Sequence, residues 1–183
     1  MVDMRNDMEC ILLSEADVQA VIARLAQEID RDYAGKKLLV VGVLKGSFIF
    51  MADLVRLLQN KCEMEFMAVS SYGAGTTTSG QLTVKKDIAA DLSGYHVLLM
   101  EDILDSGFTV SKVKEMLMQR NAESVKVCVF LDKKERRTVQ IEGDYVGAVV
   151  PDAFVVGYGL DYAQLYRNLP YVGVLKKEIY EGK

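Results

Sequence analysis

The segment from Glu101 to Thr109 concentrates side chains that could bind a sugar phosphate. It reads Glu-Asp-Ile-Leu-Asp-Ser-Gly-Phe-Thr and follows the apolar run Val97-Leu98-Leu99-Met100. Free backbone amides at the start of a helix bind phosphate, and a glycine lets the backbone approach the ligand closely. Three carboxylates beside such a turn could hold sugar hydroxyls, a magnesium ion or a proton. We therefore expect a phosphate-binding site here.

Helix capping is a simpler interpretation of the same residues. Asp105 or Ser106 could cap the following helix, while Glu101 and Asp102 are solvated at a strand end. For any single residue this interpretation is favoured. It explains the whole arrangement less well, because three acids then stand at the mouth of a buried strand beside a glycine turn.

The composition excludes several other kinds of site. The 183 residues contain a single histidine, His96, and three separated cysteines without a C-x-x-C pair. A zinc site with several imidazoles is therefore impossible, a disulfide framework is not favoured, and His96 is interpreted as structural. The net charge of −4 argues against a nucleic-acid or anionic-membrane surface, so we expect neither partner. Any phosphate ligand then needs a local cationic site or a metal ion.

Alternating strand and helix patterns predict an α/β fold. Apolar runs without polar alternation indicate parallel strands that are covered on both faces. Expected strands lie at 38–44, 65–69, 97–100, 125–131 and 145–150, with a short one at 154–156. Expected helices begin after Ser14 and span 48–58 and 109–120, and the Ser, Thr and Gly-rich stretch 70–80 is expected to be a mobile loop.

The order of these elements predicts where the site lies. Strands interleaved with helices form an open sheet with right-handed crossovers, and ligands bind beyond the carboxyl ends of such strands. Without a repeat or linker, one domain over residues 1–183 is expected. The longest strongly apolar run, Leu38 to Leu44, is too short to span a bilayer, so a soluble, cytoplasmic protein is expected.

The run from Val97 to Thr109 resembles the 5-phosphoribosyl-1-pyrophosphate signature of the type I phosphoribosyltransferases. Further segments are similar to the bacterial hypoxanthine-guanine branch of that family, in order over nearly the whole chain. They are Leu44–Ser47, Ser70–Gly73, Leu131–Lys133, Val150–Asp152, Phe154–Tyr162 and Tyr166–Pro170. The resemblance implies a central, mainly parallel sheet flanked by helices, with a small hood subdomain from the chain ends. It also implies a purine-salvage transferase that makes IMP or GMP and pyrophosphate from hypoxanthine or guanine.

The resemblance also implies a role for each matching residue. Asp105 would exchange a proton with the purine imidazole ring, and Glu101 and Asp102 would hold the ribose hydroxyls. The remaining matches are Ser106, Gly107, Phe108 and Thr109 for the 5′-phosphate, Lys45, Gly46, Ser71, Tyr72 and Arg167 for pyrophosphate, and Lys133, Phe154, Val155 and Asp161 for the purine. Mg²⁺ would be held by Glu101, Asp102 and Asp161. In the family, a non-proline cis peptide often precedes the lysine that matches Lys45.

Three questions stay open at this point. A xanthine- or guanine-preferring enzyme would share the same fold and differ around the purine edge. A regulator that uses the phosphoribosyltransferase fold to bind nucleotide and nucleic acid is a different class, which the retained Asp105 and the net acidity disfavour. The family usually forms dimers or tetramers, so a homodimer or homotetramer is expected.

Overall fold

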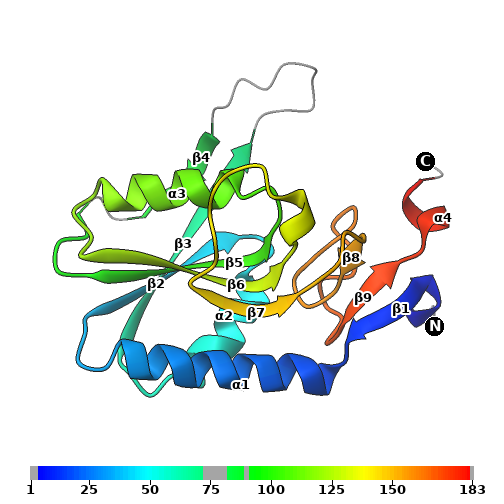
Figure 1. Cartoon of the computed structure of the whole chain (residues 1–183), viewed down its shortest axis with the longest axis horizontal. Coiled ribbons are helices and arrows are strands. Elements are labelled where there is room, and N and C mark those ends of the chain that lie inside the picture. Colours follow the sequence, from blue (N-terminus) through cyan, green and yellow to red (C-terminus); the bar gives the residue numbers. More distant parts are fainter. Residues whose placement is uncertain (1–3, 72–81, 89–90, 182–183) are drawn as a thin grey trace.

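The computed structural model of the chain describes residues 4–71, 82–88 and 91–181, and its larger unit is a six-stranded sheet (Figure 1). The strands are β2 (Leu38–Leu44), β3 (Cys62–Ser71), β4 (Leu82–Lys86), β5 (His96–Leu104), β6 (Ser124–Asp132) and β7 (Tyr145–Val149). Their order is β4-β3-β2-β5-β6-β7, and every neighbouring pair is parallel except the antiparallel pair β3–β4. The expected α/β fold with a mainly parallel sheet is confirmed.

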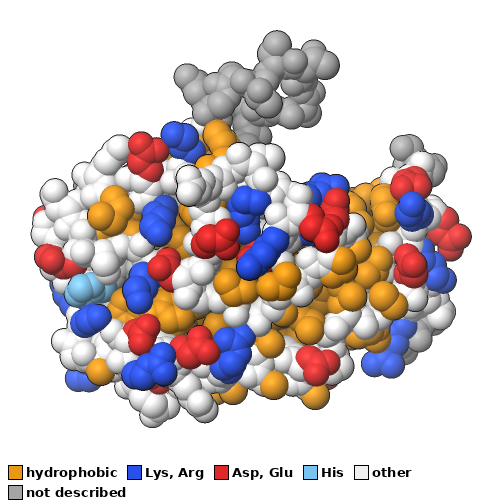
Figure 2. All heavy atoms as spheres, viewed as in Figure 1, with side chains coloured by type: hydrophobic (Ala, Val, Ile, Leu, Met, Phe, Trp, Pro, Cys, Tyr) orange, Lys and Arg blue, Asp and Glu red, His pale blue; other side chains and the backbone are white. Residues whose placement is uncertain are grey.

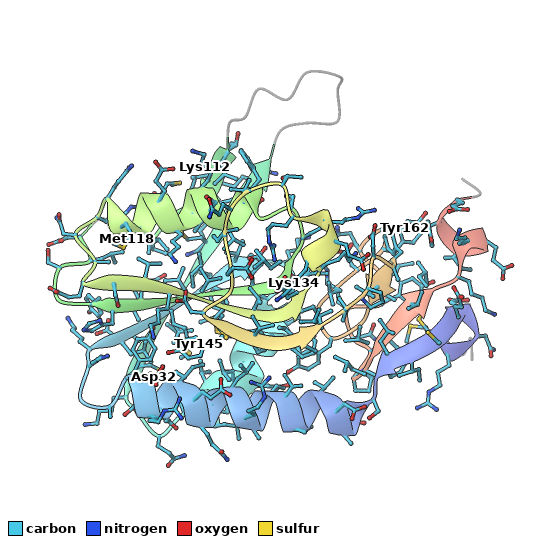
Figure 3. All side chains as sticks on the ribbon, in the orientation of Figure 1. Asp32, Lys112, Met118, Lys134, Tyr145 and Tyr162 are labelled. Atoms are coloured by element: carbon cyan, nitrogen blue, oxygen red, sulfur yellow. The ribbon has the colours of Figure 1, made fainter. Side chains whose placement is uncertain are left out.

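Helices cover both faces of this sheet (Figure 1). They are α1 (Glu15–Asp32) and α2 (Phe48–Val55) on one face and α3 (Phe108–Met118) on the other. Ser14 caps α1 as its sequence indicates, since the Ser14 hydroxyl accepts from the Asp17 amide and the Asp17 carboxylate accepts from the Ser14 amide. At the other end of α1, the Tyr145 hydroxyl donates to Asp32 Oδ2 at 2.8 Å, which ties the helix to β7 (Figure 3).

The two ends of the described chain build a smaller unit, which we call the hood. It is an antiparallel sheet in the order β1-β9-β8, from β1 (Met8–Leu13), β9 (Val172–Leu175) and β8 (Val155–Val156). Two short helices flank it, η1 (Met4–Asp7) and α4 (Lys177–Tyr180). The Lys176 amide donates to the Asp7 carbonyl at 2.9 Å, so the first and last elements are joined (Figure 1). The hood expected from the chain ends is confirmed.

Several boundaries differ from the sequence-based expectations. Strand β5 runs to Leu104 rather than ending at Met100, because β6 continues beside it and pairs Leu104 with Asp132. Glu101 and Asp102 therefore lie inside a strand. Helix α2 ends at Val55, three residues before the expected end, and α3 ends at Met118.

Six elements were not expected from the sequence, and one expected loop is only partly described. The unexpected elements are the strands β1, β4 and β9, the helix α4, and the short helices η1 and η2 (Lys134–Arg136), all of six residues or fewer. Ser70 and Ser71 complete β3, whereas residues 72–81, which hold most of the expected loop, lie outside the described residues. In the described part of the chain, none of the helices is long and apolar enough to cross a membrane.

Candidate active site

A tight turn between β5 and α3 forms the phosphate loop, which we define as residues 105–109. Gly107 has a φ of 84°, and α3 begins directly after it at Phe108. The Ser106 hydroxyl accepts from the Phe108 amide at 3.3 Å, and a pocket of about 70 Å³ opens here. Its lining residues are Glu101, Ile103, Leu104, Asp105, Ser106, Gly107, Thr109 and Val110. The pocket thus lies at the start of α3, where backbone amides and the side chains of Ser106 and Thr109 favour phosphate binding.

The left-handed backbone at Gly107 makes this loop sensitive to any side chain. A Cβ added there would lie 2.5 Å from Ile141 Cγ2 and 3.1 Å from Arg137 Cδ. We expect Gly107→Ala to lower the free energy of unfolding by roughly 2–4 kcal/mol, because backbone strain and a steric clash add. Urea unfolding measures this loss. Gly35→Ala is the matched control, since Gly35 has a φ of 73° and no atom within 4 Å of its added Cβ. An equal loss in both variants would show that the clash is unimportant.

A second chain segment supports the phosphate loop from behind. The amides of Thr138 and Val139 donate to the Ser106 carbonyl at 3.0 and 3.2 Å. Arg137 Nη1 donates to the Asp105 carbonyl at 2.8 Å, and the Arg137 guanidinium also pairs with the fully buried Asp132 carboxylate. The loop backbone is therefore held in place through its carbonyl groups.

Glu101 and Asp102 form an acid pair beside the pocket. Burial, followed by the neighbouring Asp102 charge, raises the pKa of Glu101 well above its ordinary value, and Glu101 Oε2 has no hydrogen-bond partner among the described residues. Burial also raises the pKa of Asp102 from 3.8 to about 6, against the lowering effects of the Ile103 amide and the Arg167 charge. Two desolvated carboxyl groups side by side favour binding of a cation or of hydroxyl donors.

The raised pKa of Asp102 has a consequence for stability. The folded protein holds the Asp102 proton more tightly than the unfolded chain does. The contribution of this proton to the free energy of unfolding is therefore fully present below pH 3.8 and is lost as the pH rises through 6. We expect Asp102→Asn to stabilise the free protein by about 1–3 kcal/mol at pH 8 and to have little effect at pH 4. Urea unfolding at both pH values measures the difference.

Asp87→Asn serves as the control with the opposite sign. A hydrogen bond from Arg120 lowers the pKa of Asp87, so this variant should lose stability at pH 8, by about 1 kcal/mol or less because the pair is partly exposed. A stability gain at pH 8 that is the same at pH 4 would contradict the assignment to Asp102 ionisation.

The turn after β2 approaches the acid pair closely. A Cβ on Gly46 would overlap the Asp102 carboxylate, and a Cβ on Gly159 would overlap the Gly46 carbonyl. The peptide bond between Leu44 and Lys45 is cis, as is frequent in the family that the sequence resembles. Three segments far apart in the sequence therefore meet at one point, and glycine is required at two of the contacts.

A polar network links the expected pyrophosphate residues. Lys45 Nζ donates to Gln164 Oε1 at 3.0 Å, and Arg167 Nη2 lies 2.7 Å from Asp161 Oδ1. The Gln164 amide donates to Asp161 Oδ2 at 2.8 Å, and Arg167 Nη1 donates to the Gly159 carbonyl at 2.7 Å. Arg167 Nη2 also donates to Gln164 Oε1, at 3.5 Å. The cationic side chains of Lys45 and Arg167 thus share the Gln164 side-chain oxygen as a hydrogen-bond acceptor.

Of the expected purine residues, Lys133 and Phe154 lie beside Ala153, whereas Asp161 belongs to the polar network around Arg167. Lys133 is buried, and its Nζ donates to the Ala153 carbonyl at 2.9 Å, next to Phe154. Arg136 contacts both Asp152 and Asp105. Its Nε lies 2.7 Å from Asp152 Oδ1, and its Nη1 lies 4.0 Å from Asp105 Oδ2. Arg136 therefore connects Asp105, in the phosphate loop, to Asp152, which lies near residues expected to bind the purine.

The structure brings most expected site residues together, with two exceptions. Ser71 is the last residue of β3, and its side chain is not described, while Tyr72 lies outside the described residues. Sequence reasoning missed Gln164 and Arg137. Neither has a sequence signal, since Gln164 occurs in a loop with a φ of 69° and Arg137 ends a charged run. His96 lies at the opposite end of β5, where its Nδ1 is 2.8 Å from Ser124 Oγ.

The fold and this site define a class: an α/β protein whose parallel sheet carries a phosphate loop and an acid pair at the carboxyl end of one central strand. A family model, described as the phosphoribosyl transferase domain, matches residues 12–163. The chain belongs to this family.

Relatives that match nearly the whole chain are hypoxanthine-guanine phosphoribosyltransferases. The chain is 48% identical to the Streptococcus pneumoniae protein, covering 98% of this chain and 99% of that protein. A hypoxanthine phosphoribosyltransferase structure from Staphylococcus aureus superimposes with a TM-score of 0.93 at 45% identity, covering 97% and 96% of the two chains. The bifunctional protein TilS/HprT of Listeria monocytogenes is 52% identical over 97% of this chain, which spans only 27% of that longer protein.

Proposed function

We propose that this chain is a hypoxanthine-guanine phosphoribosyltransferase of purine salvage, which acts as one domain in the cytoplasm. It transfers the phosphoribosyl group of 5-phosphoribosyl-1-pyrophosphate to hypoxanthine or guanine, and releases pyrophosphate with IMP or GMP. The observation that carries the proposal is the position of Asp105 in the phosphate loop, from which Arg136 reaches Asp152 beside Lys133. The high identity to enzymes of this name over their full length supports it.

The reaction explains why these side chains are needed. The bond between the anomeric carbon and pyrophosphate breaks while a purine nitrogen bonds to that carbon. Positive charge therefore develops on the ribose and negative charge on the leaving pyrophosphate. Lys45 and Arg167, which share Gln164, would bind the leaving group, and the amides of the phosphate loop would hold the 5′-phosphate throughout.

Asp105 would accept the proton that the purine imidazole ring loses as the new bond forms. Its side chain is 40% exposed and so accessible to a substrate, while its Oδ1 is buried and lacks a hydrogen-bond partner among the described residues. Lys133 would donate to the 6-oxo group of hypoxanthine or guanine. An ammonium donor meets the amino group of adenine unfavourably, so this contact would exclude adenine.

The residues present fit a magnesium ion that arrives with the substrate. Glu101 and Asp102 supply hard oxygen ligands, and the buried Glu101 Oε2 has no hydrogen-bond partner among the described residues. The described residues contain no group of three or more His, Cys, Asp or Glu side chains that could enclose a metal. Mg²⁺ is usually held by one or two carboxylates together with substrate phosphates, which matches this donor set. When bound, it would neutralise charge on pyrophosphate. Asp161 would act through water, because its carboxylate already pairs with Arg167.

Nucleotide formation by the purified protein tests the proposal. We expect IMP from hypoxanthine and GMP from guanine when 5-phosphoribosyl-1-pyrophosphate and MgCl₂ are supplied, and no AMP from adenine. Addition of EDTA should stop the reaction. Xanthine as a fourth substrate decides between this enzyme and a xanthine-preferring one. Absence of both IMP and GMP would overturn the proposal.

We also propose that the enzyme forms a homodimer or homotetramer. Hydrophobic side chains gather over the region of β7, β8 and β9 (Figure 2). Val149 and Leu165 are each 61% exposed, which favours an interface between copies. Light scattering after gel filtration measures the mass, and a monomer at micromolar concentration would contradict this proposal.

A further inference from the structure

Helix α4 places an aromatic ring against Phe154, which the family resemblance implies for purine binding and whose ring would stack on the base. The Tyr180 ring of α4 is stacked on Phe154, with centroids 4.7 Å apart and an angle of 22° between the ring planes. Tyr162 also contacts Phe154, edge to face, with centroids 5.7 Å apart and an angle of 87°. Figure 3 shows Tyr162 beside the hood, on the loop that follows β8. The proposed purine site is thus bordered by a small aromatic cluster.

The three ring distances show that Tyr162 does not lie over the face of Phe154 opposite Tyr180. If they covered opposite faces, their centroids would be about 10 Å apart, the sum of the two distances to Phe154. The centroids of Tyr162 and Tyr180 are instead 6.4 Å apart. No other ring of the described residues pairs with Phe154, which is 38% exposed. In the described part of the chain, no aromatic ring therefore stacks on the face of Phe154 opposite Tyr180.

Tyr180 is itself held by the hood. It packs with Ile179 against the buried hood cluster that contains Met8, Tyr166 and Leu175. The Leu175 amide donates to the Phe154 carbonyl at 2.8 Å, so β9 also fixes the Phe154 backbone. The backbone and the ring of Phe154 are thus both supported by the last residues of the chain.

We propose that Tyr180 is a positioning residue for purine binding: it stacks on the rear face of Phe154 and holds that ring ready for the base. This inference rests on the proposed function. A free phenylalanine ring would lose side-chain freedom when the purine binds, whereas a ring already fixed by its contacts with Tyr180 and Tyr162 loses little. Aromatic pairs contribute modestly beyond their buried area, so the effect is on affinity for the base rather than on the chemical step.

Steady-state kinetics of Tyr180 variants test the proposal. In Tyr180→Ala, we expect KM for hypoxanthine to rise roughly three- to tenfold, the scale of one aromatic pair, while KM for 5-phosphoribosyl-1-pyrophosphate stays within twofold of wild type. Tyr180→Phe keeps the ring and should restore the wild-type KM. Tyr95→Ala is the control for loss of a tyrosine elsewhere, because Tyr95 bonds to Glu63 at the far end of the sheet.

A double-mutant cycle shows whether Tyr180 acts through Phe154. In a Phe154→Leu background, Tyr180→Ala should raise KM for hypoxanthine no further, since the stacked pair is already lost. Full additivity would overturn the proposal, as would an unchanged KM in Tyr180→Ala. A lower KM would also overturn it, because it would mean that Tyr180 occupies the position of the base. If the wild-type protein itself forms no nucleotide, the proposed function fails instead, which separates the two failures.

Discussion

Replacing Asp105 with asparagine is expected to lower kcat for IMP formation about 10²–10⁴-fold, the usual contribution of a positioned general base. The amide keeps the size and polarity of the side chain but cannot take up the proton that the purine releases. The Asp105 backbone carbonyl still accepts from Arg137 Nη1, so the phosphate loop should keep its shape. KM for 5-phosphoribosyl-1-pyrophosphate should therefore change little. Steady-state kinetics with each substrate varied in turn measures both effects.

A neighbouring carboxylate supplies the matched control for Asp105→Asn. Asp152 also pairs with Arg136, at 2.7 Å from Nε, but it lies on the purine side of the site rather than at the phosphate loop. Asp152→Asn should change kcat far less than Asp105→Asn. A wild-type kcat in Asp105→Asn would refute the assignment of Asp105 as the base. It would leave the proposed transferase activity itself intact.

The central part of the site was predictable because its chemistry is continuous in the sequence. Residues 101–109 carry the acids, the glycine and the hydroxyls in one run, and the local physics of a helix start decides what that run can bind. The strand boundary was less predictable. Tertiary pairing of β5 with β6 extends β5 through the acids, and that pairing depends on a segment more than twenty residues away.

The supporting residues could not be predicted, because their roles depend on contacts between distant segments. Gln164 joins Lys45 to Arg167 only after a loop containing several left-handed residues returns to the turn after β2. Tyr180 reaches Phe154 only because the hood brings the chain ends together. The short strands of the hood have weak patterns of their own, and each is stabilised by its partner in the antiparallel sheet.

Arg137→Met is expected to lower the free energy of unfolding by about 3–5 kcal/mol, the usual effect of removing one partner from a buried ion pair. Asp132 is fully buried, the Arg137 side chain is 12% exposed, and the two groups form an ion pair at the end of β6. Without the guanidinium, the Asp132 carboxylate is left buried and unpaired. Urea unfolding measures the loss, and Lys112→Met is the control, since its ion pair with Glu115 is exposed and should contribute about 0.5 kcal/mol or less.

The double variant Asp132→Leu with Arg137→Met separates the charge effect from the support of the phosphate loop. Removing both charges should recover most of the lost stability, because an apolar pair of similar volume is tolerated where an unpaired charge is not. The hydrogen bond from Arg137 Nη1 to the Asp105 carbonyl is still missing. We therefore expect KM for 5-phosphoribosyl-1-pyrophosphate to be raised in Arg137→Met and to remain raised in the double variant, although the double variant has near wild-type stability. If stability and KM both return to wild type, Arg137 acts only in folding and does not hold the phosphate loop.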